Sequence, residues 1–269
     1  MKADLINMDL TRHIVEIARL AGEKILEVYN DPSETFVGYK NENSPVTKAD
    51  LLSNSIILAA LEKITPKLPV ITEESSLVPY STRSLYKKYW LIDPLDGTKE
   101  FLKKNDEFTV NIALIEDGKP QFGVVHAPAI NRTFFGGKKI GAWKDEGGGP
   151  EPITVNTSPP KILKIVASKH HSGRTLELFL SRIGEHSLIS MGSSLKFCLV
   201  ADGTADIYPR FSPTMEWDTA AAQAVVEGAG GMVQDLSGQT LSYNRKEMLN
   251  SSFIVTGSDQ IHWQAWIKE

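Results

Sequence analysis

The stretch that decides the fold reads YWLIDPLDGT and covers residues 89–98. Its first four residues are apolar and β-rich, which predicts a strand. Asp93 and Asp96 follow where this strand ends. Pro94 fixes its own φ and favours an extended conformation at Asp93. The chain can then turn so that both carboxylates face one point, and such hard oxygen ligands suit Mg²⁺.

The remainder of the stretch suits a phosphate group. The Leu95 carbonyl can face the same point as the two carboxylates. Gly97 lets the backbone approach a ligand closely, and Thr98 can begin a helix whose free N–H groups bind phosphate. Two ions bridged by one carboxylate could generate a hydroxide and stabilise the leaving oxygen of an in-line displacement. The pattern therefore predicts a metal-dependent phosphoryl chemistry.

Two further acidic sites lie at comparable positions. Glu73 and Glu74 follow the predicted strand PVIT, and Asp218 follows Trp217 at the start of a predicted helix. Strand ends and helix starts are where α/β proteins gather ligand groups. Taken singly, these residues would be a turn, a solvated pair and a helix cap. Taken together in this order, they favour a metal site.

Other site chemistries lack their residues. The six histidines show no H-E-x-x-H spacing and Cys198 is the only cysteine, which argues against zinc. The flanks of Cys198 are apolar, so we expect a small buried residue and not a nucleophile. The pair His170-His171 is more typical of a surface or loop. The sequence contains no G-x-S-x-G elbow and no P-loop, which leaves an α/β-hydrolase and a P-loop NTPase without support.

The composition is that of a globular protein. The chain has 269 residues, of which 41% are hydrophobic and 23% charged. The net charge of −4 argues against a general nucleic-acid binder, so the countercharge for an anionic ligand must be local. No apolar run approaches the ~20 residues of a membrane span. The first residues carry charges where a secretory signal would be apolar. We therefore expect a cytoplasmic enzyme.

Periodicity divides the chain into two predicted lobes. An α+β lobe, 1–155, carries the Glu73 and Asp93–Thr98 motifs, and an α/β lobe, 156–269, carries Asp218 and substrate contacts. Asp117-Gly118 predicts a hairpin turn, and 145–160 reads as an exposed loop. The predicted helices are 8–30, 49–64, 173–183, 193–201, 217–228 and 258–268. The predicted strands are 69–72, 89–93, 109–115, 121–127, 132–137, 140–145, 162–168, 187–190, 206–209, 232–235 and 253–257.

At these motifs the chain resembles the inositol-monophosphatase superfamily. Its signatures D-P-[LI]-D-G-T and W-D-x-[AG]-[AG] stand here as Asp93–Thr98 and Trp217–Ala221. A K-x-D motif stands as Lys48–Asp50, and the acidic pair of the next strand as Glu73-Glu74. The resemblance covers nearly the whole chain. It implies a layered α+β and α/β sandwich of alternating helices and sheets, and a magnesium-dependent phosphatase that lithium inhibits.

The resemblance also assigns metal ligands. Glu73, Asp93 and the Leu95 carbonyl would hold a first Mg²⁺. Asp93, Asp96 and Asp218 would hold a second ion. These assignments are what the resemblance implies for the matching positions.

The same resemblance assigns the remaining catalytic roles. Asp50 and Glu73 would support a weaker third ion. Thr98, oriented by Asp50, would help to activate the attacking water. The backbone N–H groups of Gly97 and Thr98 would bind the phosphate.

Two stretches select a subfamily. Lys99-Glu100 replaces the x-N that follows D-G-T in typical inositol monophosphatases, and Tyr208–Phe211 stands where those enzymes commonly carry an acidic residue. Arg210 in this second stretch suits a substrate that brings a further phosphate. With Gly192–Phe197, these features resemble the bacterial 3'(2'),5'-bisphosphate nucleotidases, which hydrolyse adenosine 3',5'-bisphosphate to AMP and phosphate in sulfate assimilation. The expected substrate contacts are Glu73, Leu95, Asp96, Gly97, Thr98, Ser193, Ser194, Lys196, Arg210 and Asp218.

Alternatives stay open at this point. Arg210 and Lys196 can equally be surface charges. An inositol or sugar-phosphate monophosphatase on the same scaffold is the second enzyme hypothesis, and an inactive nucleotide-binding sensor comes from another class. We expect a small-molecule substrate, no nucleic-acid partner and no transmembrane segment. The protein would be a monomer or homodimer, cytoplasmic or peripheral on the cytoplasmic side of the inner membrane.

Overall fold

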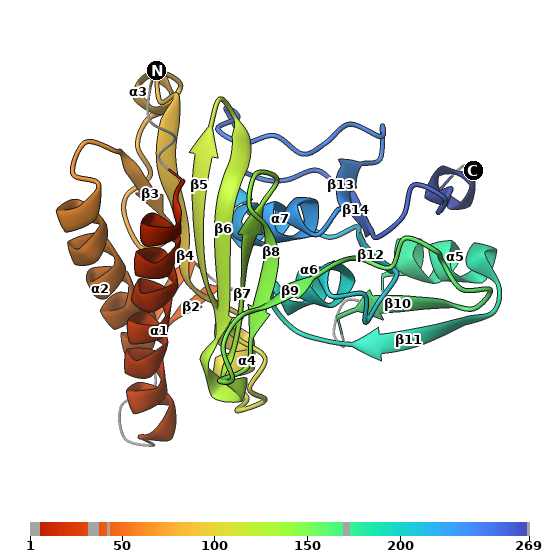
Figure 1. Ribbon diagram of the computed structural model, residues 1–269, viewed down its shortest axis with the longest axis horizontal. Coiled ribbons are helices and arrows are strands. Elements are labelled where there is room, and N and C mark those ends of the chain that lie inside the picture. The colour runs from red at the N-terminus through yellow and green to blue at the C-terminus, as the bar shows by residue number, and fades with distance from the viewer. Residues whose placement is uncertain (1–5, 32–37, 42–43, 169–172, 268–269) are drawn as a thin grey trace.

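Two large β-sheets, separated and flanked by helices, make up the protein (Figure 1). The computed structural model describes residues 6–31, 38–41, 44–168 and 173–267. From one side to the other the layers are helices, a seven-stranded sheet, helices, a five-stranded sheet and helices. This is the layered α and β architecture that the sequence predicts.

The seven-stranded sheet has its strands in the order β3-β4-β5-β6-β7-β8-β9. Only β3 and β4 are parallel, and the other neighbours are antiparallel. Asp117 and Gly118 join β5 to β6 with φ values of 48° and 70°, the left-handed pair of a tight hairpin turn. The strands are β3 (Val70–Thr72), β4 (Lys88–Asp96), β5 (Thr109–Glu116), β6 (Lys119–Ala127), β7 (Arg132–Gly137), β8 (Gly141–Asp145) and β9 (Glu151–Ile153).

Helices α1 (Met8–Asn30) and α2 (Lys48–Ile64) cover the outer face of this sheet. Alternate residues of β4 face opposite sides, so Trp90 and Ile92 pack under these helices while Leu91 packs on the other face. A strand buried on both faces carries little polar–apolar alternation, which explains the unbroken apolar sequence before Asp93.

Helix α7 (Glu216–Gly228) covers the inner face, and α6 (Leu195–Ala201) packs against α7 and the five-stranded sheet, so both helices lie between the two sheets. The contact is close: a Cβ at Gly123 in β6 would lie 2.2 Å from the Ala221 carbonyl oxygen, so only glycine fits there. α7 thus belongs to the C-terminal half of the chain but completes the core of the N-terminal sheet. The division into lobes at residue 155 stays a proposal.

The five-stranded sheet has the order β11-β10-β12-β14-β13. Its outer face is covered by α5 (Arg174–Ile183) and the short 3₁₀ helix η2 (Trp263–Trp266). Phe179 of α5 packs edge-on against Phe211 and Trp266. The strands are β10 (Leu163–Ala167), β11 (His186–Ser190), β12 (Ile207–Arg210), β13 (Met232–Asp235) and β14 (Phe253–Thr256).

Some predicted elements differ in the structure. The prediction of a helix over 258–268 is wrong for the described residues 258–267, because the segment starts with a turn in which the Ser258 hydroxyl accepts the Gln260 N–H. Among these residues only η2 is helical. The expected loop 145–160 contains β9, which pairs with β8. Short elements that the sequence pattern did not predict are β1 (Gly38–Asn41), β2 (Ser44–Val46), α3 (Tyr80–Arg83) and η1 (Pro128–Ile130).

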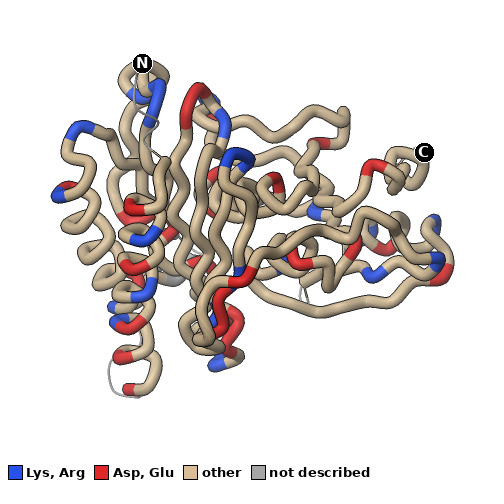
Figure 2. The backbone as a smooth tube through the Cα atoms, in the orientation of Figure 1, with Lys and Arg blue, Asp and Glu red and all other residues tan. Residues whose placement is uncertain are grey.

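Other expectations concern single residues and charge. Cys198 is fully buried in α6, as expected, and burial raises the pKa of its thiol. The pair His170-His171 lies outside the described residues. Figure 2 shows positive and negative residues interspersed along the described chain. None of the helices in the described ranges has both the length and the apolar composition needed to cross a membrane.

Candidate active site

The first acidic residues meet because β3 and β4 are parallel neighbours. Thr72 pairs with Ile92, and the Glu73 N–H donates to the Ile92 carbonyl at 3.2 Å. Glu73 therefore follows β3 at the level where Asp93 stands in β4. The Asp93 carboxylate accepts the Leu95 N–H at 3.0 Å, which fixes the turn through Pro94. The local sequence thus brings two carboxylates to one sheet edge.

The third carboxylate comes from the other half of the chain. Asp218 lies in the first turn of α7, and its Oδ2 accepts the Met215 N–H at 2.8 Å. One ligand atom from each of Glu73, Asp93 and Asp218 lies within 4.8 Å of the others. Carboxylates at such distances are suited to bind a shared cation.

The electrostatics of this cluster favour a positively charged partner. Burial raises the pKa of Asp93, and the carboxylates of Glu73, Asp96 and Asp218 raise it further. The pKa of Asp218 is raised for the same reasons, with burial first. Buried like charges are costly unless a counter-ion compensates them. An all-oxygen donor set of this kind fits a hard divalent cation.

A pH dependence of stability follows for metal-free protein. A carboxyl whose pKa is raised by folding holds its proton more tightly in the folded chain. The free energy of unfolding therefore decreases as pH rises above the ordinary carboxyl pKa of about 4. In EDTA, Asp93→Asn should unfold at a higher temperature than wild type at ~pH 8, and the difference should shrink as pH falls toward ~4. Scanning calorimetry at several pH values measures this, and a pH-independent difference would contradict it.

A threonine lies beside the carboxylate cluster. Gly97 has a φ of 90° and precedes α4 (Thr98–Leu102). A Cβ at Gly97 would come within 3.2 Å of the Glu107 carbonyl oxygen, in a conformation that side chains rarely adopt. The Thr98 hydroxyl is 3.3 Å from Asp50 Oδ1 and 3.4 Å from the Leu95 carbonyl oxygen. The glycine thus sets where the threonine hydroxyl lies.

Asp50 is held for this contact from the other side. It is 1% exposed, and its Oδ2 accepts both the N–H and the hydroxyl of Thr47, at 2.7 and 2.6 Å. In this capping arrangement at the start of α2, the other carboxylate oxygen, Asp50 Oδ1, faces the Thr98 hydroxyl. The structure therefore joins α2 to the turn after β4 through one carboxylate.

Asp96 contacts the loop before α6. Its Oδ2 accepts the Ser193 hydroxyl and the Ser194 N–H. The Ser194 hydroxyl donates to Asn111 Oδ1 at 2.8 Å and is 2.7 Å from Thr109 Oγ1. Ser193 and Ser194 are expected from the sequence as substrate contacts. In the structure both form hydrogen bonds with Asp96 and with residues of β5.

Sequence patterns did not single out Asn111 or Thr109. Register pairs Asn111 with Asp93 and Thr109 with Asp96 across β4 and β5, so both stand directly beside the acidic turn. The signal that could have identified Asn111 is an amide within the otherwise apolar run VNIAL. Buried polar residues in such a strand need partners, and here the partner network leads to Asp96.

A cavity adjoins the acidic cluster, and the two basic residues expected as substrate contacts, Lys196 and Arg210, line it. Lys196 is 4% exposed, so it is not a surface charge, and its Nζ donates to the Ser193 carbonyl at 2.5 Å. Burial lowers its pKa to about 8, and Arg210 also lowers it. Arg210 Nε donates to the Ser212 carbonyl at 3.2 Å. The lining also includes Asp96, Gly97, Glu100, Ser168, Ser193, Ser194, Phe197, Tyr208, Thr214, Asp218 and Thr219.

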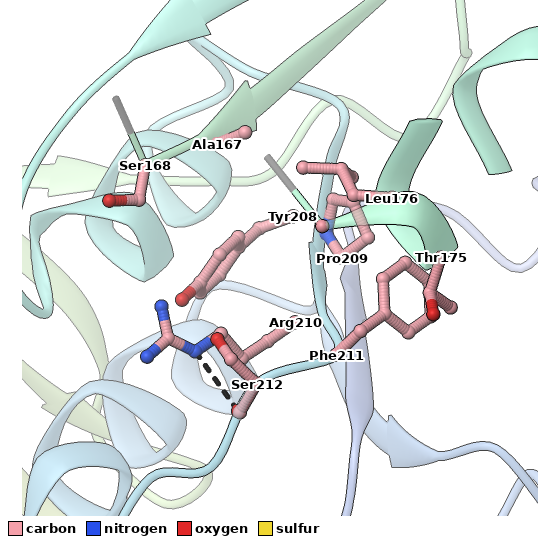
Figure 3. Close-up of a pocket in the computed structure, with 10 residues that line it drawn as sticks. Ala167, Ser168, Thr175, Leu176, Tyr208, Pro209, Arg210, Phe211 and Ser212 are labelled. Atoms are coloured by element: carbon pink, nitrogen blue, oxygen red, sulfur yellow. Dashed lines mark hydrogen bonds between the residues drawn. The ribbon is translucent and has the colours of Figure 1, made fainter. Parts of the chain in front are cut away.

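A second cavity, of about 310 Å³, continues from the first (Figure 3). Ser168, Tyr208 and Arg210 border both cavities. Figure 3 shows the Arg210 guanidinium directed toward the Tyr208 hydroxyl, with Leu176 and Phe211 on the far side. The second cavity therefore has an apolar wall on one side. On the side toward the acidic residues it is bordered by the cationic side chain of Arg210.

Comparisons with known proteins agree with this arrangement. The sequence model of the inositol monophosphatase family matches residues 7–267. The chain is 45% identical over 248 residues to the 3'(2'),5'-bisphosphate nucleotidase CysQ of Salmonella typhimurium, covering 92% of this chain and 99% of that protein. It is 46% identical over 244 residues to CysQ of Escherichia coli K12, covering 90% and 98%.

A solved structure shows the same fold. The crystal structure of CysQ from Bacteroides thetaiotaomicron superposes with a TM-score of 0.84 and 38% identity. The match covers 94% of this chain and 99% of that one. The similarity thus extends over both sheets and is not confined to the acidic motifs.

Proposed function

Because this chain belongs to the inositol monophosphatase family, we propose that it is a 3'(2'),5'-bisphosphate nucleotidase. It hydrolyses the 3'-phosphate of adenosine 3',5'-bisphosphate to give AMP and phosphate, a reaction linked to sulfate assimilation. The observation that carries the proposal is the position of Arg210, which borders both cavities. A cation there can bind a second phosphate while the first lies at the carboxylates.

The proposed substrate pose follows from the two cavities. The reacting phosphate lies against Gly97 and Thr98, beside Asp96 and Asp218. The second phosphate contacts Arg210, with Lys196 close by. The nucleoside occupies the second cavity, where Phe211 and the neighbouring apolar side chains suit an aromatic base.

The metal assignment is part of this proposal. Family membership implies a divalent metal, and we propose two Mg²⁺ ions, with a weaker third. Glu73, Asp93 and the Leu95 carbonyl would hold one, and Asp93, Asp96 and Asp218 the other. When bound, Mg²⁺ lowers the pKa of water and offsets negative charge on the phosphate. Burial and the neighbouring carboxylates raise the pKa of Asp93 and Asp218, and a cation bound between these groups would offset that repulsion.

Thr98 and Asp50 act on the attacking water. The Thr98 hydroxyl donates to Asp50, so its oxygen is left as an acceptor for a proton of the water. Thr47 fixes the Asp50 carboxylate through two hydrogen bonds. The orientation of the Thr98 hydroxyl, which donates to Asp50, is thereby set before substrate binds. Such positioning acts mainly on the transition state.

A substrate panel tests the proposed function. Rates of phosphate release, expressed as kcat/KM, are measured with Mg²⁺ for adenosine 3',5'-bisphosphate, 3'-AMP and inositol 1-phosphate. The proposal predicts that the bisphosphate is preferred over both monophosphates. A preference for inositol 1-phosphate would instead support an inositol or sugar-phosphate monophosphatase. Binding of the bisphosphate without any release of phosphate would support an inactive sensor.

Arg210→Ala should discriminate between substrates. We expect kcat/KM to fall more for adenosine 3',5'-bisphosphate than for 3'-AMP, which lacks the 5'-phosphate. Expressed as lost transition-state stabilisation, the difference between the two substrates should be about 1–3 kcal/mol. The reason is loss of a hydrogen bond to a charged partner, and the difference should decrease at higher salt. Lys196→Ala is measured in parallel, because either cation can contact that phosphate. Equal losses on both substrates for both variants would exclude this role.

A further inference from the structure

Two buried charged residues outside both cavities meet on one short loop. Glu216, the first residue of α7, is 0% exposed, and Arg83, the last residue of α3, is 1% exposed. Residues 244–246 lie between them and bond to both. Ionised groups are rarely buried unless a specific arrangement holds them.

Glu216 attaches the start of α7 to the loop. Its Oε2 accepts the Asn244 N–H at 2.7 Å, and its Oε1 accepts the Arg245 N–H at 3.1 Å. The Arg245 Nε donates to the same oxygen at 3.2 Å. Three donors therefore converge on one carboxylate, two residues before Asp218.

Arg83 attaches the same loop to the β3–β4 connection. Its Nη1 donates to Asn244 Oδ1 and the Arg245 carbonyl, at 3.0 and 2.7 Å. Its Nη2 donates to the Lys246 carbonyl at 2.7 Å, and Asn244 Nδ2 returns a bond to the Arg83 carbonyl at 2.6 Å. α3 belongs to the connection that joins Glu73 at the end of β3 to β4.

A second set of hydrogen bonds, made by Asn250, joins the start of α7 to the same loop. Asn250 Nδ2 donates to the Met215 carbonyl at 2.9 Å and lies 3.0 Å from Thr219 Oγ1. Arg245 Nη2 in turn donates to Asn250 Oδ1 at 2.7 Å. The residues on both sides of Asp218 are thus tied to the loop that Arg83 holds.

The connected elements are those that present the carboxylates. Arg83 lies between Glu73 and Asp93 in the sequence, and Glu216 lies beside Asp218. The three carboxylates repel one another, so their spacing must be maintained by the surrounding structure. We propose that Arg83 and Glu216, acting through residues 244–246, are positioning residues that hold Asp218 at cation-binding distance from Glu73 and Asp93. The inference rests on the proposed function only for the identity of the cation.

The test measures Mg²⁺ binding to the protein without substrate. Glu216→Gln retains the volume but turns an amide donor toward the converging N–H groups. Arg245→Gln removes the guanidinium from a residue whose side chain is 32% exposed, so that variant should fold. Glu227→Gln is the matched control, because Glu227 lies on α7, has a side chain 6% exposed and pairs with Lys138 near the opposite end of the helix.

We expect calorimetry to show Mg²⁺ binding about 10- to 100-fold weaker in Glu216→Gln and Arg245→Gln, the effect typical of residues that orient metal ligands. Glu227→Gln should bind Mg²⁺ as wild type does. The rise in Tm on adding Mg²⁺ should decrease in the same two variants, while kcat at saturating Mg²⁺ recovers because the ligands are intact.

Unchanged Mg²⁺ affinity in both Glu216→Gln and Arg245→Gln would overturn the proposal and leave the network a role in stability alone. An equal loss in Glu227→Gln would overturn it too, because any lost charge on α7 would then suffice. If Glu216→Gln does not fold, Arg245→Gln decides the matter. A wild-type protein that binds Mg²⁺ but does not hydrolyse adenosine 3',5'-bisphosphate would refute the proposed function and leave this inference standing.

Discussion

Replacing Asp93 by Asn is expected to lower kcat for adenosine 3',5'-bisphosphate by about 1,000-fold or more, because the contribution of bound metal to such a reaction is several kcal/mol. Asp93 is proposed as the one ligand shared by both ions, and a neutral amide is a poor bridging ligand. The fold should be retained, since Asp93→Asn relieves repulsion from Glu73, Asp96 and Asp218. The measurement is phosphate release over a range of Mg²⁺ concentrations.

A surface substitution of the same kind provides the control. Asp9→Asn in the first turn of α1 removes one carboxylate far along the chain from the acidic turn, from an exposed ion pair with Arg12. Its kcat should equal that of wild type. If Asp93→Asn keeps near-wild-type kcat with Mg²⁺, the two-metal assignment is wrong.

Thr98→Ala is expected to lower kcat by about 100-fold or more while KM changes little, the range typical of groups that assist proton transfer. The hydroxyl bonds to Asp50 and the Leu95 carbonyl, so its removal leaves the attacking water without an orienting acceptor. Thr98→Ser keeps the hydroxyl and should recover much of the lost rate. Steady-state kinetics at saturating Mg²⁺ separate kcat from KM.

The pattern of the loss discriminates between two roles for Thr98. A change confined to KM would make the residue a phosphate ligand in the ground state. Failure of Thr98→Ser to recover any rate would show that the methyl packing matters and not the hydroxyl. Asp50→Asn should then be compared, since it alters the same hydrogen bond from the other end.

Most of the fold could be predicted from local patterns. The helix expected over 8–30 is α1, because its apolar residues recur at helical spacing, and the Asp117-Gly118 turn joins β5 to β6. The error at 258–268 has a physical cause. Ile261 and Trp263 give that segment an apolar pattern, but Ile261 reaches the core from a turn and Trp263 from the first residue of the short η2. Periodicity reports burial and does not by itself distinguish a helix from a packed turn.

The acidic part of the candidate site was accessible to sequence because its residues lie in short motifs. The structure brings Glu73, Asp93 and Asp218 together although they are distant in sequence. Arg83 was not accessible in this way. Its surroundings, YSTRSLYKK, contain no motif that points to a buried arginine, and its hydrogen-bond partners at 244–246 are distant in sequence. Partners contributed by backbone carbonyls leave no signature in side-chain spacing.

The placement of α7 has a consequence for the order in which the chain is made on the ribosome. The seven-stranded sheet is complete in sequence at residue 153, but its inner face is covered by a helix that begins at residue 216. Leu91, Val125 and Phe134 belong to the apolar cluster on that side, and the α7 residues that complete this cluster follow the whole sheet in the sequence. The nascent first half therefore presents an open hydrophobic sheet. The same helix supplies both the cover for this sheet and Asp218, so the carboxylate cluster is complete only when α7 has packed on the sheet.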